Sequence, residues 1–98
     1  MSKANAAVWK FTIPIDDAFE ISMPIGAELL CVREQDNRGQ LWARVVPERP
    51  VEPRRFFLRG TGHPVDLDCK YVGSFMMHDG ALVFHLFEHF GLVRGAAL

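Results

Sequence analysis

Short segments of alternating apolar and polar residues, each closed by a turn signal, make up most of this chain. In Ala7–Ile13 the large apolar residues occupy every second position, and Pro14 ends the run. The same alternation returns in 19–23, before a second turn signal at 24–26. Because successive side chains of a strand point to opposite faces, this period of two predicts half-buried β-strands.

The middle of the chain predicts a hairpin followed by an irregular excursion. Residues 28–34 and 41–46 are strand-like and flank a polar loop in which Asn37 or Gly39 can adopt a positive φ. Three prolines in 47–53 then argue against a regular strand there, because proline cannot donate to a ladder.

The second half of the chain predicts three more strands. The first covers 54–59 and is followed by a loop over 60–68. Residues 70–77 and 81–87 then flank His78-Asp79-Gly80, so they are expected to pair as a second hairpin.

The predicted fold class is therefore all-β, with six or seven antiparallel strands in a small β-sandwich or flattened barrel. A chain of 98 residues suits a single domain, 1–98, with its core over 8–88. The small, apolar tail 91–98 is expected to be flexible or to dock on a neighbour.

Composition narrows the classes of function. The formal net charge is −1, whereas generic nucleic-acid binding usually needs a basic excess, so none is expected. No apolar run approaches the length of a membrane span, and no membrane partner is expected. Two cysteines without signs of secretion predict free thiols in a cytoplasmic protein.

The segment 54–64 carries the strongest functional signal, since three arginines on an aromatic run precede a Gly-Thr-Gly-His-Pro loop. Arginine suits phosphate or carboxylate, and glycine lets the backbone approach a ligand closely. By the period of two, Arg55, Phe57 and Arg59 share one face and Arg54 lies on the other. A solvated strand face with a turn histidine is the alternative. The predicted anion site consists of Arg55, Arg59, Gly60, Thr61, Gly62 and His63.

One pattern suggests an enzyme, because His85, Glu88 and His89 fit the H-x-x-E-H arrangement of inverted zinc proteases. The aromatic and β-branched content of 81–90 instead predicts a strand. Histidines four apart on a strand lie about 13 Å apart, too far to share one zinc ion. We therefore expect no catalytic residue, no metal and no cofactor, with His85 half-buried and His89 at the exposed end of the strand.

A set of short motifs follows in order along the chain. They are Trp9-Lys10-Phe11, Met23-Pro24-x-Gly26-Ala27, Leu41-Trp42-Ala43, Arg55-Phe56, Gly60-Thr61-Gly62-His63-Pro64, Tyr71-Val72-Gly73-Ser74-Phe75 and Gly80-Ala81-Leu82-Val83-Phe84-His85-Leu86-Phe87-Glu88. Together they resemble a family of small phage and prophage proteins known as a domain of unknown function. The likeness covers residues 8–88, so His89 lies outside it.

The resemblance implies a phage context, in which small proteins often act by binding. Together with the arginine and glycine loop, it suggests a non-enzymatic protein that sequesters an anionic nucleotide-like ligand in the host cytoplasm, as counter-defence. Blocking a host defence protein, as anti-CRISPR inhibitors do, is one alternative. A virion or structural accessory role is another. The expected partners are an anionic small molecule or a host protein, and further copies of the chain in a homo-oligomer.

Overall fold

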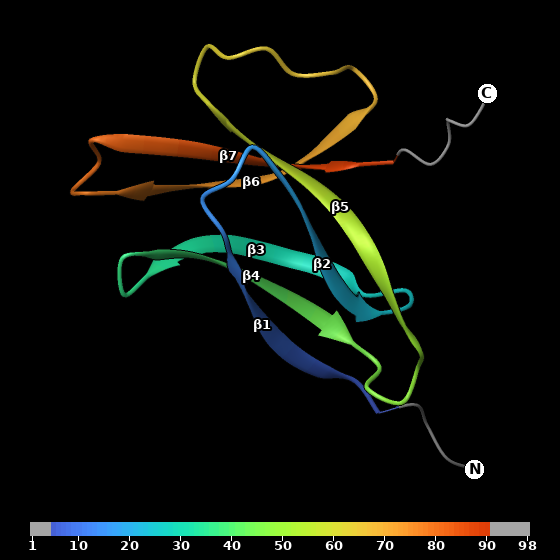
Figure 1. Cartoon of the computed structure of the whole chain (residues 1–98). Coiled ribbons are helices and arrows are strands. Elements are labelled where there is room, and N and C mark those ends of the chain that lie inside the picture. The colour runs from blue at the N-terminus through green and yellow to red at the C-terminus, as the bar shows by residue number, and fades with distance from the viewer. Residues whose placement is uncertain (1–4, 91–98) are drawn as a thin grey trace.

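The computed structural model describes residues 5–90, which form seven antiparallel strands and no helix. A three-stranded sheet has the order β1-β4-β3, and a four-stranded sheet has the order β2-β5-β7-β6 (Figure 1). The predicted all-β class is confirmed, with two sheets and no closed barrel. The tail 91–98 lies outside the described residues. The strands are β1 (Ala7–Ile13), β2 (Ala18–Pro24), β3 (Glu28–Gln35), β4 (Arg38–Val45), β5 (Val51–Gly60), β6 (Cys69–Met77) and β7 (Leu82–His89).

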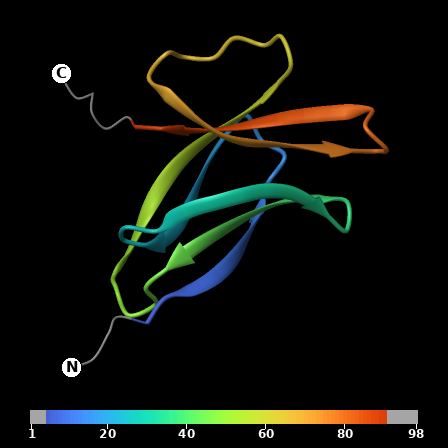
Figure 2. The same ribbon diagram turned by 180° about the vertical axis from the view of Figure 1, so that it is seen from behind.

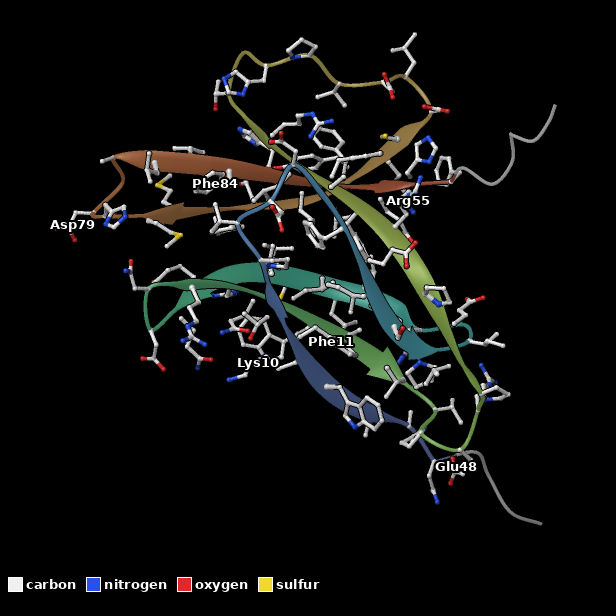
Figure 3. All side chains as sticks on the ribbon, viewed as in Figure 1. Lys10, Phe11, Glu48, Arg55, Asp79 and Phe84 are labelled. Carbon is white, nitrogen blue, oxygen red and sulfur yellow. The ribbon has the colours of Figure 1, made fainter. Side chains whose placement is uncertain are left out.

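Both predicted hairpins are confirmed, and their turns explain why. Asp36 and Asn37 connect β3 to β4 with φ of 55° and 61°, a conformation that Asp and Asn tolerate well. His78, Asp79 and Gly80 connect β6 to β7 with φ of 54°, 56° and 88°. Figure 3 shows Asp79 at the tip of this hairpin. Local turn chemistry is thus sufficient to fix these two pairings.

The two sheets meet where β6 packs across β3, and glycines permit the close approach. A Cβ atom on Gly73 would lie 3.0 Å from Val32, and one on Gly39 would lie only 2.4 Å from Phe75 Cζ. Around these contacts the inner faces bury one apolar cluster. Its members are Ile13, Met23, Ala27, Val32, Leu41, Ala43, Val45, Phe56, Leu58, Phe75 and Leu86.

The prediction of an irregular segment through 47–53 is wrong at its end, because β5 already begins at Val51. Pro53 lies inside this strand, opposite Ser22 of β2. The other neighbour, β7, ends opposite Arg55, so β5 has only one partner strand at Pro53. This is the edge position at which a strand tolerates proline.

The connection between β5 and β6 crosses over β7. Gly60 pairs with Phe84 near the start of β7, whereas Cys69 pairs with His89 at its end. Since β5 and β6 run parallel with β7 between them, the chain must travel about 17 Å back along β7. We call this crossing loop, residues 61–68, the strap. Figures 1 and 2 show it on the side of the four-stranded sheet that faces away from the three-stranded sheet.

Candidate ligand-binding face

The strap crosses a sheet face that is unusually rich in aromatic and basic side chains. Alternation along each strand sends Phe56 and Leu58 inward and their neighbours outward. The register then places the outward residues of β5, β7 and β6 side by side. We call this surface the outer face. Its members are Arg55, Phe57, Arg59, Tyr71, His85, Phe87 and His89.

Edge-to-face and tilted contacts join the rings of the outer face. Tyr71 lies 5.4 Å from Phe87 and 6.2 Å from His85, measured between ring centroids. Phe57 lies 5.3 Å from His89 in a T-shaped pair, and the Arg59 guanidinium lies 5.0 Å from the centre of the Phe57 ring. Tyr71 is 52% exposed, so one ring remains accessible for stacking.

Arg59 fixes the first half of the strap. Its Nε donates to the Pro64 carbonyl at 3.1 Å, and its Nη1 donates to the carbonyls of Asp17 and Leu58 at 2.8 and 3.0 Å. These acceptors are neutral, so they leave the positive charge uncompensated. None of the hydrogen bonds among residues 5–90 uses Nη2, which is therefore free to meet an anion.

Arg55 lies at the opposite end of the outer face and is much less constrained. Its guanidinium is 4.0 Å from Glu20, and both side chains are more than half exposed. It lines an open groove of about 630 Å³ at the end of β7, near where Figure 3 labels it. This volume is within the range of small-molecule sites. The groove is lined by Glu52, Pro53, Arg54, Arg55, Glu88, His89 and Phe90.

The loop residues of the predicted site divide into two groups. Thr61 joins the outer face, because its Oγ1 lies 2.8 Å from His85 Nε2. His63 turns away to the end of the sheet, where its ring packs against Gly60 and lines a depression beside the turn 15–17. Gly62 has a φ of 91°, which only glycine adopts readily, and no atom lies near its missing Cβ. Its role is thus to shape the turn.

Arg54 lies on the inner side, as the period of two predicts, and it is an architectural residue. Its guanidinium forms a paired ion bridge with Glu88 at 2.6 and 2.8 Å, and Nη1 donates to the Ala27 carbonyl at 2.6 Å. The hydrogen bond to Glu88 raises the pKa of Arg54, against the opposing effect of burial. The arrangement connects β5, β7 and the start of β3.

The second half of the strap ends at His89 and Cys69. His89 Nε2 lies 3.3 Å from Asp68 Oδ2, and the ring is only 17% exposed. The expectation that His89 occupies an exposed strand end is therefore wrong, because the strap covers it. Burial, reinforced by Asp68 and Asp66, raises the pKa of the Cys69 thiol. Both cysteines are free thiols.

Because β7 is a strand, its two histidines do not form the zinc site of the H-x-x-E-H proteases. His85 lies between Arg59 of β5 and Ser74 of β6. His89, four residues further along β7, lies between Arg55 and Cys69. Glu88 points inward to Arg54 instead of toward either histidine. The H-x-x-E-H residues therefore do not share one metal site.

The sequence of a domain of unknown function, DUF7352, matches residues 4–92. The chain belongs to this family. No curated protein and no solved structure matches the chain. In the part that the structure describes, no helix is long and apolar enough to cross a membrane. The family match extends over residues 4–92, and the family description names no activity.

Sequence reasoning missed the contribution of β6 and β7 to this face. Alternation already places His85, Phe87 and His89 on one side of their strand, which was an available signal. The neighbouring position of Tyr71 depends on the register of the last hairpin, which a bulge between Tyr71 and Gly73 shifts. Turn residues alone do not reveal such a shift.

Proposed function

We propose that this protein is a non-enzymatic binding protein that holds an anionic, nucleotide-like ligand on its outer face. The observation that carries the proposal is that the exposed Tyr71 ring, the half-buried rings of Phe57 and Phe87 and two guanidinium groups share one sheet face. Bases stack on aromatic side chains, and phosphates accept hydrogen bonds from arginine. The outer face offers both chemistries next to each other.

The spacing of the two cations indicates the form of the ligand. Arg55 and Arg59 are four residues apart on β5, which corresponds to about 13 Å along the strand. Hydrogen bonds to three backbone carbonyls hold the Arg59 guanidinium in place, so a ligand that contacts both cations has to span much of this distance. An extended ligand that lies along the rings, with an anionic group at each end or one end in the groove beside Arg55, matches this spacing. Dinucleotides and ADP-ribose derivatives have that form.

A binding role without chemistry agrees with the phage context that the sequence motifs imply. Sequestration of a nucleotide signal in the cytoplasm of a host cell would make the protein a counter-defence factor. An accessible face with an already formed crossing loop suits this task, because a pre-formed site loses little entropy on binding.

Thermal unfolding in the presence of linear nucleotides, cyclic nucleotides and ADP-ribose derivatives tests the proposal. A ligand that binds only the folded protein stabilises it by about 2.7 kcal/mol at a hundredfold excess over its Kd. We expect a saturable shift for the wild type that Arg55→Gln reduces strongly. Arg44→Gln is the matched control, since Arg44 is equally exposed and also pairs with a glutamate, Glu28. An equal loss in both variants, or no shift with any nucleotide, would refute the assignment.

One observation favours a second candidate function, the blocking of a host protein. Val8, Leu30 and Trp42 lie around a shallow, mostly apolar depression of about 260 Å³ on the three-stranded sheet. Exposed apolar patches mark protein interfaces, and the same patch would serve self-association or virion assembly. This alternative predicts unchanged melting with nucleotides, together with a complex or homo-oligomer in size-exclusion chromatography that Leu30→Glu disrupts.

A further inference from the structure

The end of the strap brings four metal-ligating side chains together. Asp66, Asp68 and Cys69 approach His89 from the strap and the start of β6, and one ligand atom from each lies within 4.8 Å of all the others. Asp66 and Asp68 resemble ordinary turn acids in the sequence. Because the strap crosses over β7, both lie beside a histidine more than twenty positions later in the sequence.

We propose that Asp66, Asp68, Cys69 and His89 form a zinc site that clamps the end of the strap to β7. In a tetrahedral site with bonds of about 2.0–2.3 Å, neighbouring ligand atoms are about 3.3–3.8 Å apart. The distance between His89 Nε2 and Asp68 Oδ2, 3.3 Å, already has this value. No two ligand atoms of the cluster are more than 4.8 Å apart, which is at most about 1 Å beyond this spacing, and the side chains of Asp66 and Asp68 are exposed.

The ligand atoms of these four side chains indicate which metal ion the site would bind. A thiolate and an imidazole with two carboxylates suit zinc, which is borderline-soft and accepts sulfur, nitrogen and oxygen ligands. Calcium and magnesium prefer oxygen alone, so the cysteine and histidine argue against them. Two carboxylates and a thiolate also supply three negative charges around one dication.

The environment of His89 is a second, independent indication. Its ring is held by Phe57 on one side and lies near Asp68 on the other. Its Nδ1 atom is buried and has no hydrogen-bond partner among residues 5–90. A buried, unpaired ring nitrogen is costly in a protein that has nothing to bind there. Coordination through Nδ1 would remove this cost, whereas coordination through Nε2, the nitrogen that faces Asp68, would leave Nδ1 as an N–H donor without a partner.

This site shares only His89 with the H-x-x-E-H pattern, because it uses neither His85 nor Glu88. His89 also belongs to the outer face and lines the groove beside Arg55. The cations and the exposed ring that would contact a nucleotide, Arg55, Arg59 and Tyr71, are absent from the cluster. Binding of Co²⁺ and binding of a nucleotide are measured separately, so the two proposals can fail separately.

Titration of the tag-free, EDTA-treated and dialysed protein with Co²⁺ tests the site, since cobalt reports thiolate coordination by a near-ultraviolet charge-transfer band. We expect one equivalent of Co²⁺ to produce the band in the wild type and Zn²⁺ to abolish it. Cys69→Ser is expected to remove the band, whereas Cys31→Ser, which changes the other free thiol, is expected to retain it. Failure of the wild type to bind, or a band that survives in Cys69→Ser, would overturn the proposal.

A second variant tests the site even if Cys69→Ser does not fold. Asp68 is 58% exposed, so Asp68→Asn is expected to fold normally. Loss of one ligand charge should weaken Co²⁺ binding at least tenfold, as changes to metal-site carboxylates commonly do. His78→Gln, in the hairpin turn outside the cluster, is the control and should bind Co²⁺ like the wild type. Equal affinities in Asp68→Asn and the wild type would count against the site.

Discussion

At the scale of single residues, the five arginines between positions 44 and 59 have very different roles. Arg54 is enclosed between the sheets with Glu88, and both side chains are less than 20% exposed. Arg59 donates hydrogen bonds to three backbone carbonyls. Arg55 forms only a loose contact with Glu20. Alternation predicted which face each occupies, but burial of Arg54 depends on the packing of distant strands.

The Arg54–Glu88 bridge should be the most important polar pair for stability. We expect Arg54→Met or Glu88→Leu alone to lower the free energy of unfolding by about 3–5 kcal/mol, because each leaves a buried charge unpaired. The double variant Arg54→Met/Glu88→Leu should cost much less than the sum. Urea unfolding measures all three, and Arg44→Met, at an exposed pair, should change stability by about 1 kcal/mol or less. If the loss of unfolding free energy in the double variant equalled the sum of the two single losses, the two side chains would not act as a stabilising pair.

At the scale of strands and loops, elements specified by neighbouring residues were predictable and elements specified by distant ones were not. The β3–β4 and β6–β7 hairpins follow from their turns. The early start of β5 at Val51 does not, because Pro53 is acceptable only where β7 has ended. The course of the strap over β7 likewise requires the strand order β2-β5-β7-β6. No local pattern specifies this order.

The contact between Gly39 and Phe75 should control how closely the sheets approach. Gly39→Ala places a methyl group 2.4 Å from Phe75 Cζ, so one of them must move. We expect this overpacking to cost about 1–3 kcal/mol. In the Phe75→Leu variant the smaller side chain leaves space for the added methyl group. Gly39→Ala should therefore lower the free energy of unfolding by clearly less in this variant than in the wild type. Chemical denaturation of the four proteins gives the coupling, and equal costs in both backgrounds would exclude the clash.

At the scale of the whole molecule, the two faces of the four-stranded sheet carry different kinds of side chain. The inner face packs on the three-stranded sheet, while the outer face carries rings, guanidinium groups and the strap. The sequence predicted the Arg55–Arg59 side of this surface from alternation along one strand. It did not predict Tyr71, His85 and Phe87 as neighbours, or the separation of His63, because these depend on register and on the path of the strap.

NMR mapping distinguishes nucleotide binding on the outer face from binding elsewhere on the molecule. We would record amide chemical shifts of the labelled protein with each nucleotide that raises its melting temperature. We predict saturable changes confined to β5, to the strap outside Gly62 and His63, and to the outward residues of β6 and β7, with little change near His63 or Trp42. Changes centred on the three-stranded sheet, or none with any nucleotide, would contradict it.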